Sequence, residues 1–192
     1  MKTTTEKTAT LTIEKKTLQS RLEEKNEQRQ KMIDKLTDKI DKSSKVLETK
    51  KYIVDGELTT GNAILNFLKT EATWKFTEAK GIVEAVKQTQ SAIDGITSKK
   101  VKHLLVDSTA LEAIYYFLSK VEKTGLEAAA FYIDNMVLPV SNALGRAKED
   151  RTALDQLHRD RASLEAAIDS GADLENEDGI VAEIEKELSK EI

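Results

Sequence analysis

The longest helical pattern in the sequence, in residues 124–170, most constrains what this chain can fold into. Apolar side chains recur there at alternating steps of four and three, the spacing that lines the seam between packed helices. At ~1.5 Å per residue such a helix spans roughly 70 Å, far more than a compact domain needs. The pattern predicts a long helix that reaches beyond a core. The first part of its seam consists of Leu126, Ala130, Ile133, Val137, Val140, Leu144 and Ala147.

The seam changes register in the second half of this helix. Arg151 falls on the first register and interrupts it, and Arg161 occupies one position of the register that follows. A buried arginine needs an acidic partner, so these two residues mark where the seam departs from simple apolar packing. The apolar residues of the second register are Leu154, Leu157, Leu164 and Ile168.

Local signals place the ends of this helix and one irregularity within it. Thr124 and Glu127 have the spacing of a capping box, and Ser170-Gly171 is a C-terminal stop signal. Pro139 has no backbone N–H and its ring clashes with the carbonyl four residues earlier, so we expect a kink near residues 135–138.

A second long helix is expected over residues 10–51. Its apolar stripe is narrow and has a polar gap at residues 26–29, and a helix this polar needs a partner to stay folded. We therefore predict that it pairs with residues 141–170 as a two-helix stalk. The stripe consists of Leu11, Leu18, Leu22, Met32, Ile33, Leu36, Ile40, Val46 and Leu47.

The middle of the chain predicts shorter elements. Residues 52–60 are interpreted as a turn that reverses the chain, and residues 60–94 as one helix that ends at Asp94-Gly95. Residues 98–106 fit either a helix or a strand, because periodicity does not separate the two in so short a segment. Thr109 and Glu112 form a capping box that opens a helix to Lys123.

Aromatic residues and charge divide the chain further. Every aromatic residue lies within residues 52–132, so we place a compact body at about residues 60–140. Residues 1–9 lack apolar periodicity and are expected to be disordered, and residues 171–192 are expected to form an acidic loop and a short helix. The predicted fold class is all-α: an elongated antiparallel helical bundle with a coiled-coil-like stalk and a kinked long helix.

No motif in the sequence indicates a reaction, a cofactor or a metal. The chain has no cysteine, which excludes thiol chemistry. Gly56 and Gly61 have the spacing of the phosphate-loop glycines, but Asn62-Ala63 stand where that motif needs lysine and a hydroxyl. Asp155 and His158 share a helix face without the further ligands of a metal-binding bundle. We therefore expect neither an enzyme nor a small-molecule substrate.

These patterns favour a non-enzymatic assembly protein, a subunit or adaptor of a larger multi-subunit complex such as a virion. It would bind protein partners or its own copies through amphipathic helices. The candidate partner-binding seam consists of Leu18, Leu22, Leu36, Ile40, Leu47, Arg151, Leu154, Leu157, Arg161, Leu164 and Ile168.

Two alternatives from other classes stay open at this point. Residues 126–144 are the most apolar segment and would suit a membrane-active, pore-forming-like protein, although Asp134 opposes insertion. Residues 1–55 carry 14 Lys/Arg against 10 Asp/Glu, which would suit a nucleic-acid-associated bundle. The sequence begins MKTTTEKTAT without a signal-peptide pattern and has no membrane-spanning run, so we expect a cytoplasmic protein or an assembly formed in the cytoplasm.

Overall fold

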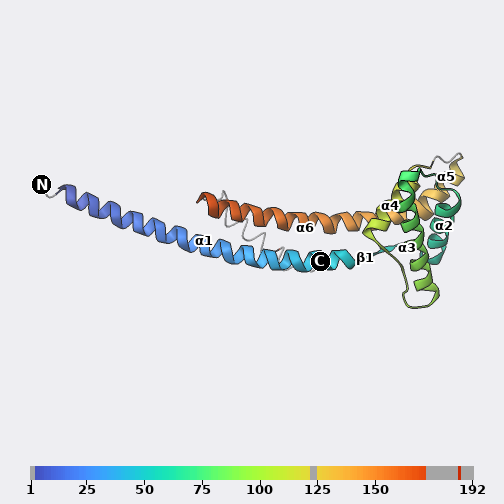
Figure 1. Cartoon of the computed structure of the whole chain (residues 1–192), viewed down its shortest axis with the longest axis horizontal. Helices are drawn as coiled ribbons and strands as arrows, with labels where there is room; N and C mark the ends of the chain where they lie inside the picture. The colour runs from blue at the N-terminus through green and yellow to red at the C-terminus, as the bar shows by residue number, and fades with distance from the viewer. Residues whose placement is uncertain (1–2, 122–124, 172–185, 187–192) are drawn as a thin grey trace. The chain divides into compact units, whose positions relative to one another are not determined.

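The computed structural model describes residues 3–121, 125–171 and 186, and their side chains except those of residues 3–18 and 57. It confirms the all-α class, with one small sheet added. The chain divides into two compact units, which are described separately. The first contains Met1–Val46 and Thr152–Ile192, and the second contains Leu47–Arg151. Figure 1 labels the elements along the chain.

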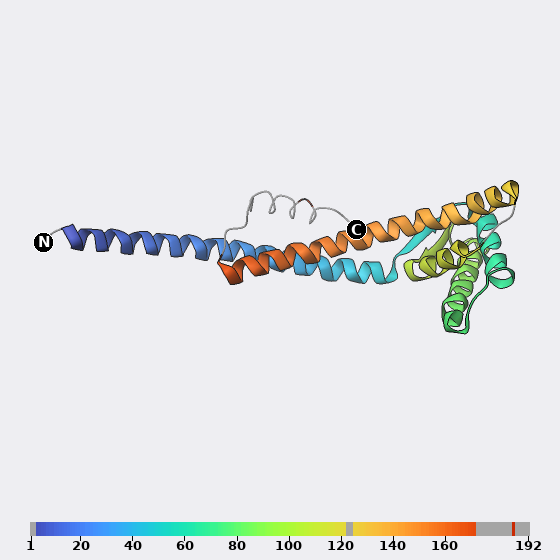
Figure 2. The same ribbon diagram turned by 90° about the horizontal axis from the view of Figure 1, so that it is seen from above.

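The first unit is built on an antiparallel pair of helices, α1 (Thr3–Thr49) and α6 (Leu138–Ser170). Figure 2 shows the red end of α6 running beside the blue part of α1. Gly171, at the end of α6, lies against Leu22, and residues further along α1 pack against earlier turns of α6. Helix α1 begins at Thr3, earlier than the sequence predicted, within the segment for which we expected disorder.

The second unit packs short helices around a two-stranded sheet. Strand β1 (Lys51–Val54) pairs antiparallel with β2 (Leu104–Asp107), with Tyr52 opposite Val106 and Val54 opposite Leu104. The segment taken for a reversing turn is therefore partly a strand, and the ambiguous segment 98–106 supplies its partner. The helical elements of this unit are α2 (Glu57–Thr70), η1 (Phe76–Glu78), α3 (Ala79–Thr97), α4 (Ser108–Ser119), α5 (Leu126–Tyr132) and the π-turn η2 (Ile133–Val137), followed by α6.

The single helix predicted over residues 60–94 is wrong. The chain leaves the helix after Thr70 and re-enters it at Ala79, so α2 and α3 fold back on each other. Folding back brings Phe67 and Ile82 into one core cluster, which a straight helix would keep apart. Gly61 permits the close approach, because a Cβ there would come within 3.0 Å of side-chain carbons of Ile93 and Leu104.

Two helix starts also differ from the prediction. Helix α2 begins directly after Gly56, whose φ of +100° favours glycine, and not near Thr60. Helix α4 is capped by Asp107, whose carboxylate accepts from the backbone N–H of Ala110 at 2.8 Å. The capping box proposed at Thr109 is therefore replaced by a cap two residues earlier. The box proposed at Thr124 lies outside the described residues.

The irregularity expected near Pro139 takes the form of the π-turn η2. Pro139 cannot donate to the carbonyl of residue 135, and the wider turn before it relieves the clash of its ring. The extra residue in this turn also changes the register. Tyr132 and Met136 are buried, whereas the predicted seam residue Ile133 is exposed. After the turn the predicted seam is correct, since Val140, Leu144 and Ala147 are buried.

Candidate functional site

Most described residues of the predicted partner-binding seam contact the chain itself. The buried core of the first unit lies between α1 and α6, and Leu154 and Ile168 pack against it half-buried. The apolar surface of the residues in this core is thus already covered within the chain. The six buried residues are Met32, Ile33, Leu36, Ile40, Leu157 and Leu164.

The remaining apolar seam residues are less buried. Leu22 is 37% exposed, and Leu47 is half-buried. The side chain of Leu18 lies outside the described residues. Binding of a partner by these residues stays a prediction.

The seam arginines lie in different surroundings. Arg151 is exposed and its Nη1 lies 3.2 Å from the Glu112 carboxylate. Arg161 is half-buried, with its Nε 3.5 Å from the Glu165 carboxylate one turn further along α6. Sequence reasoning missed Arg29, which is only 2% exposed and donates from Nη1 to the Ala167 carbonyl oxygen at 3.2 Å. The spacing of residues 29, 33, 36 and 40 would have placed it on the seam.

An apolar hollow on the second unit lies where α2 ends and α3 begins. We call it the Trp74 groove. Trp74 is 51% exposed and Val83 is 64% exposed, so two large apolar side chains of its lining face solvent. The groove has a volume of about 460 Å³ and is lined by Leu68, Trp74, Ile82, Val83, Val86 and Lys87.

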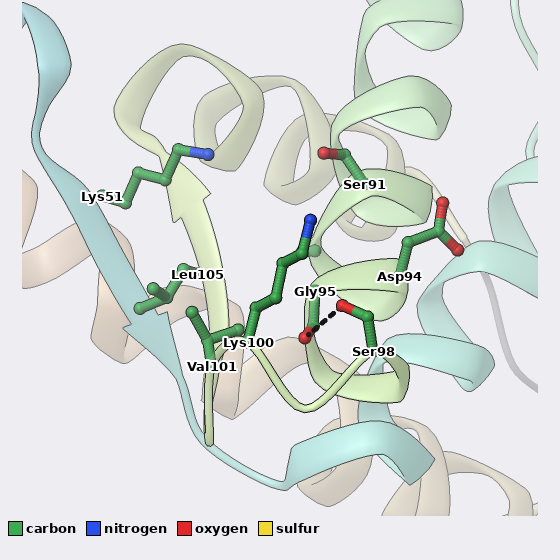
Figure 3. Close-up of a pocket in the computed structure, with 9 residues that line it drawn as sticks. Lys51, Ser91, Asp94, Gly95, Ser98, Lys100, Val101 and Leu105 are labelled. Atoms are coloured by element: carbon green, nitrogen blue, oxygen red, sulfur yellow. Dashed lines mark hydrogen bonds between the residues drawn. The ribbon is translucent and has the colours of Figure 1, made fainter.

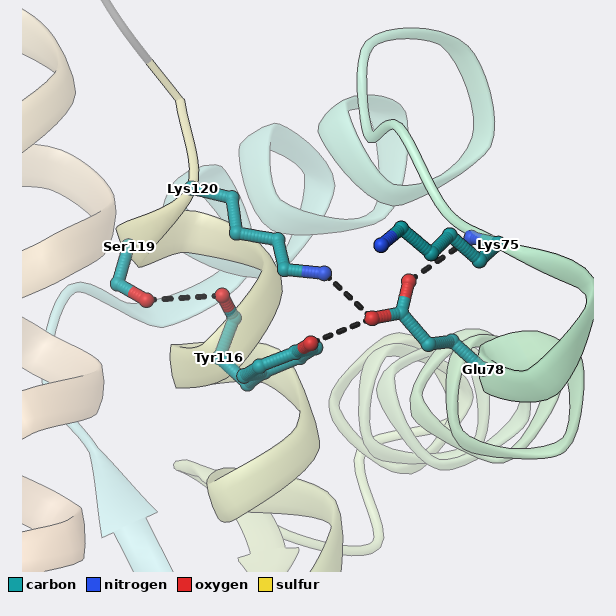
Figure 4. Close-up of polar contacts among 5 residues, drawn as sticks. All are labelled: Lys75, Glu78, Tyr116, Ser119 and Lys120. Carbon is teal, nitrogen blue, oxygen red and sulfur yellow. Dashed lines mark hydrogen bonds and ion pairs between the residues drawn. The ribbon is translucent and has the colours of Figure 1, made fainter.

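A polar cluster joins the segment that follows Trp74 to α4 (Figure 4). Glu78 accepts from Lys120 Nζ at 2.5 Å, from the Tyr116 hydroxyl, and from the backbone N–H of Lys75 at 2.8 Å. The hydrogen bond from Lys120, followed by those from Tyr116 and Lys75, lowers the pKa of Glu78 to about 2. Lys120 also lies 4.0 Å from the centre of the Tyr116 ring. Glu78 is therefore ionised at neutral pH and holds the segment after Trp74 in place.

A second exposed apolar surface follows α5 into α6. Leu126 is 87% exposed, Ile133 44% and Leu138 47%, and Ala130 is also exposed. Residues 126, 130 and 133 share a face by helical spacing, and the π-turn adds Leu138, whose N–H donates to the Ile133 carbonyl. We call these four residues the α5–α6 stripe.

Polar groups line a further cavity of about 470 Å³ between the sheet and the end of α3 (Figure 3). The ammonium groups of Lys51 and Lys100 extend into it, and the carboxylate of Asp94 lies on its far side. Ser98 donates from its hydroxyl to the Gly95 carbonyl at 3.2 Å. The cavity is lined by exposed side chains of both positive and negative charge, and this lining favours neither an anionic nor a cationic ligand.

Over the described residues, no group of three or more His, Asp or Glu side chains is placed to hold a metal ion. Asp155 and His158 are both exposed on α6. Among the same residues, no helix combines the length and the hydropathy needed to span a membrane.

Comparison with models of protein families, with curated proteins and with solved structures found no match to this chain.

Proposed function

We propose that this chain is a non-enzymatic helical subunit or adaptor of a larger protein assembly, and that it binds its partner through the Trp74 groove. The supporting observation is the exposure of Trp74 and Val83 around an apolar hollow. Apolar patches of this kind on protein surfaces mark interaction sites, and tryptophan is among the residues enriched at the centres of protein interfaces.

The polar cluster next to the groove supports the same function. Glu78, Tyr116 and Lys120 tie the segment beside Trp74 to α4, so less conformational freedom is lost when a partner binds. The same cluster argues against a catalytic role for Glu78. Its carboxylate is engaged by three donors, and its low pKa makes it a poor general base at neutral pH.

The seam between α1 and α6 supports this choice of surface. Leu36, Ile40 and Leu164 are buried against the chain's own helices, so they are not free to receive a partner in this conformation. The Trp74 groove, by contrast, is open among the described residues. Amphipathic helices bind such grooves through residues spaced by three and four positions, which defines the class of partner.

The test is site-specific photo-crosslinking in the native source. A photoreactive amino acid is placed at Val83, in the groove, or at Thr97, an exposed position on the same helix. We expect Val83 to form adducts with one defined protein and Thr97 to form none with it. Equal labelling at both positions, or no adduct at Val83, contradicts a binding groove.

A further inference from the structure

We infer that the Trp74 groove receives the α5–α6 stripe of a second copy of this chain. This inference rests on the proposed function and names the partner. Both surfaces belong to the second unit, and both are exposed within one chain, so neither already fills the other.

Two lysines lie on the face of α3 that carries Val83. Lys87 lines the groove, and Glu84, whose carboxylate accepts from the Gln88 side chain, follows Val83. Lys80, Val83 and Lys87 are spaced by three and four residues on α3 and therefore lie on one face of that helix. Lys80 and Lys87 are exposed, and neither ammonium group has an ion pair or hydrogen bond within the described residues. At ~1.5 Å rise per residue, these two charges are separated by roughly 10.5 Å along α3.

The stripe carries negative charge at the same spacing. Glu127 and Asp134 are exposed beside Leu126 and Ile133, and neither carboxylate has an ion pair or hydrogen bond within the described residues. They are also seven positions apart, with Glu127 in α5 and Asp134 in the π-turn that follows it. No lysine or arginine occurs in residues 125–145, so the described part of this face presents only acidic charge.

The two faces therefore match in chemistry and in spacing. When the stripe packs along α3, Leu126 and Ile133 cover Trp74 and Val83, and the two acidic residues lie opposite the two lysines. Helices pack through residues at steps of three and four, the steps that align these side chains on each partner. Opposite charges at equal separation fix the register and speed association, while the apolar contacts supply affinity.

The proposal is tested by analytical ultracentrifugation of the full chain and two variants. Val83→Glu disables the groove, and Leu126→Glu disables the stripe. Both positions are largely exposed, so neither change is expected to unfold the protein. Thr97→Glu is the matched control, because it adds the same charge at an exposed position of α3 outside the groove. Circular dichroism confirms that all four proteins have the same helix content.

We expect the wild type and Thr97→Glu to self-associate as concentration rises. Each disabling substitution should weaken association by about 30-fold or more, the scale of an interface hot spot. An equimolar mixture of Val83→Glu and Leu126→Glu should recover a species of twice the 21.4 kDa chain mass, because one supplies an intact stripe and the other an intact groove.

Three results would overturn the proposal: a wild type that stays monomeric at every concentration, self-association unaffected by either substitution, or a mixture that remains monomeric. Should Val83 crosslink to a different protein while the purified chain stays monomeric, the groove keeps its binding role and only the self-association is refuted.

Discussion

Removing the side chain of Leu36 should destabilise the α1–α6 pair far more than removing that of Leu22 on the same helix. Leu36 is fully buried between the two helices, whereas Leu22 is 37% exposed. Truncation of a buried leucine to alanine costs about 3 kcal/mol through lost burial and the cavity left behind. Truncation of Leu22, which keeps over a third of its surface in water, should cost only about 1 kcal/mol of stability.

Hydrogen exchange followed by mass spectrometry measures this difference locally. A loss of about 3 kcal/mol raises exchange roughly 150-fold at amides that open with the helix pair, and about 1 kcal/mol raises it only about 5-fold. We expect the increase for Leu36→Ala in residues 22–46 of α1 and 152–170 of α6, and little change in α3. Equal effects of Leu36→Ala and Leu22→Ala would refute burial of this seam within the chain.

Three further predictions concern the backbone, a charge pair and a buried arginine. Gly56→Ala should lower the unfolding free energy by about 1–3 kcal/mol, since the φ of Gly56 is +100° and the new Cβ meets the Thr60 hydroxyl. Gly81→Ala in α3 should raise the unfolding free energy by about 0.5–1 kcal/mol, since its Cβ meets nothing within 4 Å. Urea denaturation of the two variants measures both changes. The pKa of Glu78, about 2, lies below its usual 4.5, so Glu78 contributes its full stabilisation above pH 4.5 and loses it as the pH falls toward 2. When the unfolding free energy is measured against pH, this part of the pH dependence should be absent in Glu78→Gln. Arg29→Ala should cost about 1–3 kcal/mol in thermal unfolding and Arg159→Ala, at an exposed position, less than about 0.5; equal costs would contradict the burial of Arg29.

The long-helix periodicity predicted the fold class, because the α1 and α6 seams are regular and adjacent in space. Leu36, Leu157 and Leu164 are buried as the four-and-three spacing indicates. The spacing also continues through Arg29, which lies in the stretch 26–29 interpreted as a polar gap in the stripe. Its long side chain reaches a backbone carbonyl at the end of α6, so burial is compatible with its charge.

The second unit was less predictable, since its elements depend on contacts between distant segments. The helical periodicity of residues 60–94 gave no sign of the break after Thr70, which arises because α2 and α3 share one core. The β1–β2 pairing joins segments about 50 residues apart, and neither strand is long enough to show a period of its own. The π-turn before Pro139 shifted the seam by one residue and exposed Ile133.

The candidate binding surface was missed for the same reason. Trp74 belongs to the apolar content that predicted a compact core, and nothing in its local sequence separates an exposed tryptophan from a buried one. Only the fold-back of α2 onto α3 leaves Trp74 at the surface beside Val83. A protein-binding helical subunit stays a proposal, and of the seam predicted to bind the partner, Leu36 and Leu164 are buried between α1 and α6.

The fluorescence of Trp74 reports whether a partner covers the proposed binding groove, because Trp74 is the one tryptophan in the chain and lines that groove. Its emission and its quenching by acrylamide are measured in the isolated chain and in the purified native assembly. In the isolated chain, half-exposed Trp74 should emit as a solvated indole and be readily quenched. In the assembly, we expect a blue-shifted emission and strongly reduced quenching. Unchanged emission and quenching in the assembly would contradict partner binding at this groove.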